Sequence, residues 1–392
     1  MNLQKKLDFP LTEIKEGSMA IKIPDVEIKA PTSAPVFYNP KMELNRDLAV
    51  AFLQCLQRKL KRELNVCEPL TGCGVRGARF ASEVKGLKKI VINDINPKAS
   101  ALAKLNVKKF KIVEVHNKDA NMLLAEFSNP KQRFDYIDID PFGSPVPYIP
   151  YALKALRRDG VLAVTATDMA PLCGVHSKAC FRHYGVKPLR TEYCHELAVR
   201  ILCSFTATTA AKNDLAVKPL LCHSTDHYIR AYIQISKGAE KADESLNQLG
   251  YLYHCFKCLN RKTVHEPFPS IGMICEYCGT QMDFAGPLWL GDLHDRDTVK
   301  KVIGEVSLHE TLGQKKRVEK ILQVILREIR APQTYYVLNH FCDFINVSTP
   351  PYIEVLKKIR TQGYTAVPTH FNSLGIKTDM PAEKFRNLLL GK

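Results

Sequence analysis

The sequence lacks any apolar stretch of the ~18 residues that a helix needs to cross a bilayer. Its first residues, MNLQKKLDFPLTEIKEG, contain Asp8, Pro10 and Glu13 where a secretory signal would need an unbroken apolar segment. The 13 cysteines are odd in number and spread over a long chain, which does not favour a disulfide framework. We therefore expect a cytoplasmic protein with no membrane partner and with reduced thiols.

Acidic residues are scarce relative to basic ones. The chain has 40 Asp and Glu against 56 Lys and Arg, a formal net charge of +16, and most of the excess lies in residues 1–238. An excess of this size attracts polyanions such as nucleic acids. A basic surface kept for solubility would have the same composition, so charge alone does not decide between them.

The length and the pattern of apolar residues predict two domains, 1–238 and 239–392. In the first, apolar β-type runs alternate with helix-period segments, which is typical of a parallel sheet covered by helices on both faces. We expect a doubly wound α/β fold that ends in an antiparallel pair. The predicted strands are 65–70, 89–94, 112–117, 134–140, 161–167, 215–223 and 227–235, and the clearest helices are ASALAKLNVKKF and PYALKALRRDG, the latter ended by Gly160.

A glycine-rich loop, TGCGVRG, separates the first predicted strand from the next helix. Its glycines at 72, 74 and 77 have the G-x-G-x-x-G spacing, which lets a backbone and a helix N-terminus approach a ligand. Asp94 ends the second strand about 20 residues downstream, where a carboxylate can accept both hydroxyls of a ribose. A glycine triplet alone is more often a plain turn. In this context it predicts a nucleoside-containing cofactor, either a nicotinamide dinucleotide or S-adenosylmethionine.

The sequence Asp140-Pro141-Phe142-Gly143 follows the fourth strand, at the sheet edge where such folds bind ligands. Hydride transfer has no need of this combination, whereas methylation of an exocyclic base amine does, because the amine lone pair is delocalised into the ring. A carboxylate can accept an amine N–H and take its proton, an aromatic ring can stack on a base turned out of its helix, and proline stiffens the turn. The alternative is a helix-capping Asp140 and a core Phe142.

Two Cys-x-x-Cys motifs in the second domain predict a metal site. Cys255, Cys258, Cys275 and Cys278 are spaced so that four thiolates can surround one Zn²⁺. A redox site would need only one such motif at a helix start. Since four cysteines close the coordination shell, the zinc would be structural.

The rest of the second domain predicts a small α+β module. GAEKADESLNQLG resembles an interdomain connection, and helices are expected at 315–330, at 353–364 with Gly363 at its end, and in PAEKFRNLLLGK, with a strand in TAVPTHF. Basic side chains such as Lys357, Lys358 and Arg360 suit binding to a phosphate backbone. A plain packing domain is the alternative.

Six segments together make the chain resemble the tRNA guanine-N2-dimethyltransferases that modify position 26, and they span almost its whole length. They are VFYNPKMELNRDLAV, EPLTGCGVRGARF, IVINDINPKA, DYIDIDPFGSPVPYI, VTATDMAPLCG and THFNSLGIKTD. The resemblance implies a class I, Rossmann-like methyltransferase fold with a C-terminal α+β zinc-containing domain that contacts tRNA. The chain departs from the family pattern in Gly72-Cys73-Gly74, in Gly77 and in Pro368, where one contact to the RNA backbone is put in doubt.

The resemblance also assigns roles to the cofactor-binding residues. Arg46 and Arg76 would bind the carboxylate of S-adenosylmethionine, for which a guanidinium is well shaped. Gly74 would lie in the cofactor loop and Asp94 would hold the ribose. The pair Asp119-Ala120 would hold the adenine.

For catalysis, the resemblance makes Asp140 the catalytic carboxylate, with Phe142 and Phe37 on either side of the guanine. Cys173 could instead be the nucleophile of a pyrimidine-carbon methyltransferase, but Asp140-Pro141-Phe142 already supplies amine chemistry. We expect a monomeric enzyme that dimethylates the N2 amine of guanine 26 in tRNA. The alternatives are a methyltransferase for another nucleic-acid amine, an NAD-dependent oxidoreductase and a catalytically idle RNA-binding protein.

Overall fold

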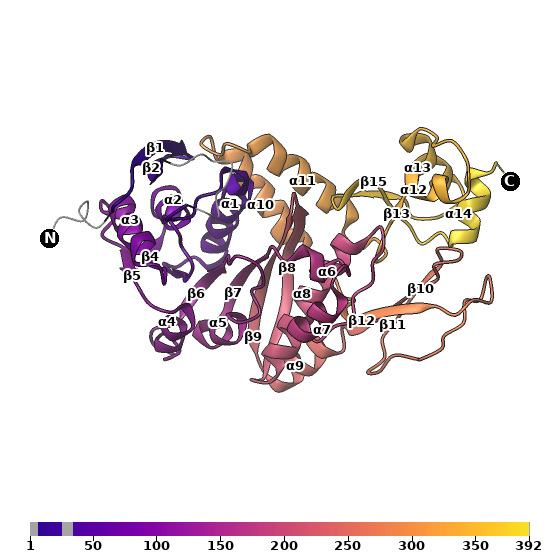
Figure 1. Cartoon of the computed structure of the whole chain (residues 1–392), viewed down its shortest axis with the longest axis horizontal. Helices are drawn as coiled ribbons and strands as arrows, with labels where there is room; N and C mark the ends of the chain where they lie inside the picture. Colours follow the sequence, from indigo (N-terminus) through magenta and orange to yellow (C-terminus); the bar gives the residue numbers. More distant parts are fainter. Residues whose placement is uncertain (1–6, 26–33, 392) are drawn as a thin grey trace. The chain divides into compact units, whose positions relative to one another are not determined.

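The computed structural model describes residues 7–25 and 34–391 (Figure 1). A seven-stranded sheet has the order β5-β4-β3-β6-β7-β9-β8. The pairings of β3 with β4 and β6, of β4 with β5 and of β6 with β7 are parallel, and β8 pairs with β9 antiparallel. This confirms the predicted fold class. The strands are β3 (Leu64–Glu68), β4 (Leu87–Asn93), β5 (Val113–His116), β6 (Phe134–Ile139), β7 (Leu156–Ala166), β8 (Leu215–Thr225) and β9 (Tyr228–Lys237).

The contacts divide the chain into two compact units. The first contains residues 1–141, 147–164 and 297–322, and the second contains 142–146, 165–296 and 323–392. This grouping does not follow chain order, because a segment from beyond residue 296 joins the first unit. The functional division at residue 238 therefore stays a prediction.

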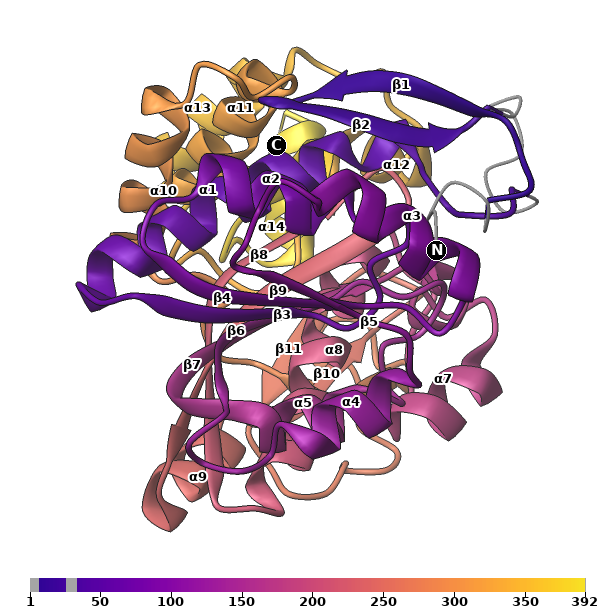
Figure 2. The ribbon, with the colours of Figure 1, turned by 90° about the vertical axis from the view of Figure 1, so that its left-hand side faces the viewer.

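Helices cover both faces of the parallel strands in the first unit. In Figure 2, α1, α2 and α3 lie on one side of β3 and β4, and α4 and α5 lie on the other. An antiparallel hairpin, β1 (Leu11–Glu16) and β2 (Met19–Pro24), adds to this unit. The helices are α1 (Glu43–Leu60), α2 (Val75–Glu83), α3 (Pro97–Val107), α4 (Ala120–Glu126), α5 (Ile149–Ala155) and α10 (Arg296–Leu308), and the short helix η3 (Pro40–Met42) precedes α1.

The second unit contains two small sheets besides β8 and β9. The first has the order β11-β10-β12, and the second, β13-β15-β14, packs with helices around an apolar core. The strands are β10 (Leu249–His254), β11 (Arg261–Val264), β12 (Asp283–Trp289), β13 (Tyr336–Val337), β14 (Val367–Thr369) and β15 (Asn372–Lys377). The helices are α6 (Met169–Leu172), α7 (Ser177–Tyr184), α8 (Cys194–Ala211), α9 (Ala239–Leu246), α12 (Leu338–Phe344), α13 (Tyr352–Thr361) and α14 (Ala382–Leu389), and α11 (Lys315–Glu328) begins in the first unit and ends here.

One local prediction is wrong. Gly160 does not end a helix, because α5 stops at Ala155 and β7 begins at Leu156, which pairs with Phe134 of β6. A Cβ on Gly160 would lie 3.1 Å from the Asp135 carbonyl oxygen, so close backbone packing favours glycine there. Residues 238–250, predicted to connect two domains, include the helix α9, which buries Ala242 and Ser245.

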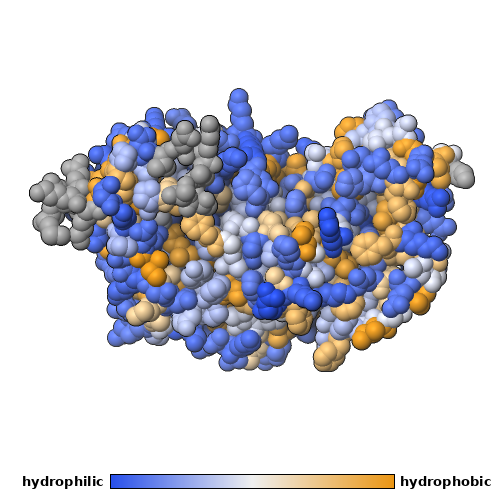
Figure 3. All heavy atoms as spheres, in the orientation of Figure 1, coloured by the Kyte–Doolittle hydropathy of each residue, from blue (hydrophilic) through white to orange (hydrophobic). Residues whose placement is uncertain are grey.

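Hydrophilic residues cover most of the face shown in Figure 3, with apolar residues scattered among them. Among the described residues, no helix combines the length and the apolar character needed to cross a bilayer.

Candidate active site

The glycine loop between β3 and α2 has the backbone that its sequence predicts. Gly72 and Gly74 have φ angles of 56° and 80°, in the left-handed region that favours glycine. A Cβ on Gly74 would lie 2.9 Å from the Cβ of Ala103 in α3, so packing also excludes a side chain there. Because these glycines have no side chains, the loop backbone can contact a ligand directly.

Asp94 follows β4 and joins the glycine loop to the start of α3. Its Oδ2 accepts a hydrogen bond from the Gly72 N–H (2.9 Å) and its Oδ1 accepts one from the Asn96 N–H (2.9 Å). Burial raises the pKa of Asp94, and the two backbone bonds oppose this change. The carboxylate is held at the carboxyl edge of the strands, where a ribose is expected.

The loop after β5 is fastened to the loop after β4. Asp119 caps α4 by accepting hydrogen bonds from the N–H groups of Asn121 (2.9 Å) and Met122 (3.1 Å), and Ala120 is buried. The Asn117 side chain donates to the carbonyl oxygens of Asp94 (2.8 Å) and Ile95 (2.9 Å). These hydrogen bonds join the loops after β4 and β5 into one continuous rim at the carboxyl edge of the two strands.

Sequence analysis missed two apolar side chains on this rim, Ile95 and Met122. Ile95, in the loop after β4, is 64% exposed, and Met122, in the first turn of α4, is 63% exposed, although large apolar side chains are more often buried. Each closely follows an acidic residue already singled out, Asp94 or Asp119. That adjacency is the signal that could have identified them.

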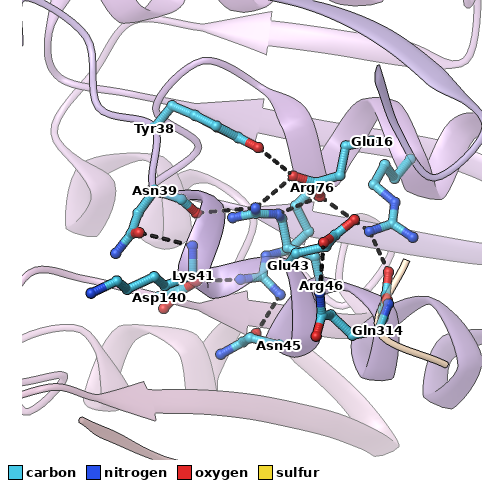
Figure 4. A network of polar contacts seen from close by, with 12 residues as sticks. Glu16, Tyr38, Asn39, Lys41, Glu43, Asn45, Arg46, Arg76, Asp140 and Gln314 are labelled. Atoms are coloured by element: carbon cyan, nitrogen blue, oxygen red, sulfur yellow. Dashed lines mark hydrogen bonds and ion pairs between the residues drawn. The ribbon is translucent and has the colours of Figure 1, made fainter. Parts of the chain in front are cut away.

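Arg46 in α1 is held by a carboxylate from the N-terminal hairpin (Figure 4). Its Nε and Nη2 donate to the two oxygens of Glu16, each at 2.6 Å, and Nη2 also donates to the Asn39 carbonyl oxygen (3.1 Å). The Tyr38 hydroxyl donates to Glu16 as well (2.9 Å). Both charged side chains are at most 5% exposed. Glu16 was not among the predicted site residues.

Arg76, in the first turn of α2, pairs with the candidate catalytic carboxylate (Figure 4). Its Nη2 makes a short charged hydrogen bond to Oδ2 of Asp140, and its Nη1 donates to Oδ1 of Asn45 (2.9 Å). Nη1 also lies 3.5 Å from Oδ2 of Asp138. The Arg76 side chain is 3% exposed and that of Asp140 is 17% exposed. An arginine of the glycine loop therefore orients Asp140.

Glu68, at the end of β3, is a third carboxyl group beside Arg76 and was also missed. Its Oε2 accepts hydrogen bonds from the Thr71 hydroxyl (2.6 Å) and the Gly77 N–H (3.0 Å), and its Oε1 lies 3.5 Å from Nε of Arg76. Burial raises the pKa of Glu68 to about 8, although Arg76 opposes the change. The sequence signal that could have identified Glu68 is its position at the end of the predicted strand, directly before the glycine loop.

The two aromatic residues expected at the base lie in different units. Phe142 belongs to the second unit and is 66% exposed, so it is not a core residue. Its turn is anchored within that unit, because the Gly143 N–H donates to the Thr167 hydroxyl (2.7 Å) and the Thr167 N–H donates to the Gly143 carbonyl oxygen (3.0 Å). Phe37 belongs to the first unit, where its carbonyl oxygen would lie 3.0 Å from a Cβ on Gly72.

Cys173 is poorly suited to be a nucleophile. A hydrogen bond with Cys194 and burial raise the pKa of its thiol well above the ordinary value. A thiol needs to ionise before it attacks. Asp140 therefore remains the stronger candidate for the reacting group.

The four predicted metal ligands lie together in the second unit. The Sγ atoms of Cys255 and Cys278 are 3.4 Å apart, those of Cys258 and Cys275 are 3.5 Å apart, and all four lie within 4.8 Å of one another. This donor set and spacing fit one tetrahedral Zn²⁺ bound by thiolates.

The two halves of this cluster have the same backbone. The Leu259 N–H donates to the Cys255 carbonyl oxygen (2.8 Å), and the Gly279 N–H donates to that of Cys275 (2.9 Å). Leu259 and Gly279 also share a left-handed conformation, with φ of 60° and 67°. Two matched turns that present four thiols support a dedicated metal site rather than a chance grouping.

Comparisons with known proteins agree with this geometry. A family model described as "N2,N2-dimethylguanosine tRNA methyltransferase" matches residues 17–390. A "tRNA (guanine(26)-N(2))-dimethyltransferase" of Methanothermobacter thermautotrophicus is 41% identical over 379 residues, which cover 96% of this chain and 98% of that protein. A "tRNA (guanine(26)-N(2)/guanine(27)-N(2))-dimethyltransferase" of Aquifex aeolicus is 35% identical, covering 95% of this chain and 94% of that protein.

Among solved structures, the chain is similar to Trm1 from Pyrococcus horikoshii in complex with S-adenosyl-L-methionine. The TM-score is 0.86 at 36% sequence identity, and the match covers 97% of this chain and 100% of that one.

Proposed function

The chain belongs to the N2,N2-dimethylguanosine tRNA methyltransferase family, and on that premise we infer that it transfers two methyl groups from S-adenosylmethionine to the N2 amine of guanine 26 in tRNA. The pairing of Asp140 with Arg76 carries this conclusion, because it holds a carboxylate beside a cofactor-type glycine loop. An oxidoreductase would have no use for that carboxylate. An idle RNA-binding protein would not need it either.

We assign the catalytic role to Asp140. Arg76 holds its Oδ2, so the carboxylate keeps one orientation and Oδ1 is the oxygen that we assign to the amine N–H. When Oδ1 accepts a hydrogen bond from this N–H, the amine lone pair becomes more localised. The carboxylate then receives the proton as the new N–C bond forms. S-adenosylmethionine would supply an electrophilic methyl group, whose bond to the sulfonium sulfur breaks as the N–C bond forms. Phe142 and Phe37 are proposed to stack on the base, which must leave its helix to reach the carboxylate.

The proposed cofactor residues lie on the loops at the carboxyl edge and on α1. Gly74 would offer its backbone and Asp94 would bind the ribose. Arg46 would bind the cofactor carboxylate through Nη1, since its other nitrogens donate to Glu16 and Asn39. Arg76 assists as a second positive charge. For the adenine we propose Asp119 and Ala120 together with the exposed Ile95 and Met122.

We further propose that residues 239–392 form a tRNA-contacting domain with one structural Zn²⁺. Four thiolates close the coordination shell, so the metal would support the fold and bind no substrate. The basic residues of α11 and α13 are available for phosphate contacts.

The test is nucleoside mass spectrometry after incubating the protein with S-adenosylmethionine and a tRNA transcript. We expect N2,N2-dimethylguanosine, and none from a transcript with adenine at position 26. Asp140→Asn should lower kcat by about 10²–10⁴ while calorimetry shows unchanged affinity for S-adenosylmethionine. Asp243→Asn, at an exposed position of α9, is the control and should be fully active. A methylated adenine or pyrimidine would overturn the proposal.

A further inference from the structure

A cavity of about 220 Å³ lies in the second unit, lined in part by Glu276 and Tyr277, which stand between two of the clustered cysteines in the sequence. Tyr277, which contributes to the lining, stands between Cys275 and Cys278 and is 42% exposed. Arg261 and Lys262 of β11 line it as well, together with Thr334. These lining residues are outside the sets proposed for methyl transfer and for zinc binding.

Arg261 is fixed in place beneath this cavity. Its guanidinium carbon lies 3.8 Å from the ring centre of Tyr336 and 4.7 Å from that of Tyr193. Its Nη1 donates to the Thr334 hydroxyl (2.8 Å) and to the Tyr335 carbonyl oxygen (2.6 Å). Cation–π contacts on two rings and two hydrogen bonds leave the side chain little freedom to move.

Two nitrogens of Arg261 nevertheless lack hydrogen-bond partners. Nε and Nη2 are buried and donate to none of the described residues, and the side chain is 8% exposed. Glu192 partly balances the charge of Arg261, but its Oε1 lies 3.7 Å from Nη2, which is too far for a hydrogen bond. Native proteins rarely leave buried donors unsatisfied. Arg261 belongs to the cavity lining, but both nitrogens are closed to solvent, so an acceptor from outside the chain reaches these two unsatisfied donors only when neighbouring lining residues shift.

The other side chains of the cavity identify the kind of ligand. Glu276 and Asp379 also line it, so bare phosphate would meet repulsion as well as attraction. A nucleobase edge presents both donors and acceptors, which match carboxylates and a guanidinium together. Unpaired RNA bases are typically bound by stacking on aromatic side chains and by hydrogen bonds to their edges. Tyr277 provides an exposed ring of that kind.

We propose that this cavity binds one unpaired nucleotide of the tRNA, distinct from the guanine that is methylated. The base stacks on Tyr277 and places its acceptor atoms on Arg261 and Lys262. The site would thus contribute to tRNA affinity and to the choice of tRNA. This inference rests on the proposed function, because it takes tRNA as the substrate.

The test compares Tyr277→Ala with Phe256→Ala in steady-state methylation of a tRNA transcript. Phe256 lies between the other two cysteines, is 52% exposed and is not part of the cavity lining. Tyr277→Ala should raise KM for tRNA at least about fivefold, since stacking of one base is worth ~1–3 kcal/mol, and should leave kcat within about twofold. Phe256→Ala should change neither. Zinc content and affinity for S-adenosylmethionine should be the same in both variants.

Two further measurements keep the inference testable if Tyr277→Ala loses zinc. Arg261→Lys keeps the charge but loses the second donor arm, and it should raise KM in the same way. A photoreactive benzoylphenylalanine at position 277 should cross-link to one tRNA site outside position 26. Unchanged KM in both variants, or cross-links spread over the whole tRNA, would overturn the inference. If the unmodified enzyme makes no dimethylguanosine, the proposed function itself has failed.

Discussion

The charged core of the first unit and the cysteine cluster of the second differ in what completes them. Around Arg46 and Arg79, side chains that are at most 5% exposed pair with carboxylates of the same unit. Among the residues that the structure describes, the apolar core at the cysteines has five buried members, which are Tyr251, Tyr253, Cys255, Cys275 and Met282. Nearby, Phe268 and Ile271 are 78% and 89% exposed. The first region is held together by its own side chains, whereas the second, on our proposal, is completed by a Zn²⁺ bound to its four thiols.

Removal of the proposed metal should produce the largest difference in stability between the two regions. A structural Zn²⁺ contributes on the order of 10 kcal/mol to the free energy of folding of the domain that binds it. The small apolar core at the cysteines cannot replace a contribution of that size. Cys275→Ser should abolish zinc retention, measured by elemental mass spectrometry. Hydrogen exchange should show loss of protection over residues 249–289, while calorimetry shows that the first unit still binds S-adenosylmethionine. Cys173→Ser should keep its zinc, and unchanged protection in a zinc-free Cys275→Ser sample would show that the metal is not structural.

Neutralising Glu16 should have the next largest effect, in the first unit. Glu16→Gln keeps the volume but leaves Arg46 and Arg79 without the carboxylate that binds both. Loss of one partner from a buried pair typically costs about 3–5 kcal/mol, to be measured as the free energy of unfolding in urea. Glu126→Gln breaks a pair with Lys118 whose side chains are 49% and 40% exposed, and should cost less than ~1 kcal/mol. Equal losses in the two variants would contradict the buried network.

The same contrast explains what could be predicted from the sequence. The grouping of the four cysteines was predicted completely, because they come from two short local turns with a recognisable spacing. The glycine loop and the parallel strands were predicted for the same reason, since turn residues and apolar periodicity are local signals. The position of the glycine loop then follows from the sheet, because the loops after parallel strands lie at the same edge.

Pairing between distant residues could not be predicted in this way. Arg46 was predicted to be a site residue, but its partner Glu16 is 30 residues away in β1, a strand that sequence analysis did not identify. Glu68 beside Arg76 was missed although the two lie in one quoted segment. Gly160 was misassigned because strand pairing with β6 overrides the local helix-ending signal. Residue types are encoded locally, whereas their partners depend on the tertiary fold.

A pH series should sharpen the comparison within the first unit. Because burial raises the folded-state pKa of Glu68 from 4.5 to about 8, its contribution to stability is full below pH 4.5 and is lost as the pH rises to about 8. Glu68→Gln stays neutral throughout. The melting temperature of this variant minus that of the unmodified protein should therefore increase between pH 5 and pH 9. Glu126→Gln, at the surface, should show no such trend, and a flat difference for Glu68→Gln would argue that Arg76 keeps this carboxyl group ionised.

The smallest expected effects come from one glycine in each unit, and they should have opposite signs. Gly279 in the second unit has φ +67°, and a Cβ added there would meet no atom within 4 Å, so Gly279→Ala meets only backbone strain and should destabilise by about 1–2 kcal/mol. Gly304 lies within α10 of the first unit, also with open space around it, and Gly304→Ala should stabilise by up to ~1 kcal/mol through helix propensity. Urea midpoints measure both changes, and zinc content checks that Gly279→Ala keeps its metal. A stabilising Gly279→Ala would mean that the left-handed turn at the cysteines is not required.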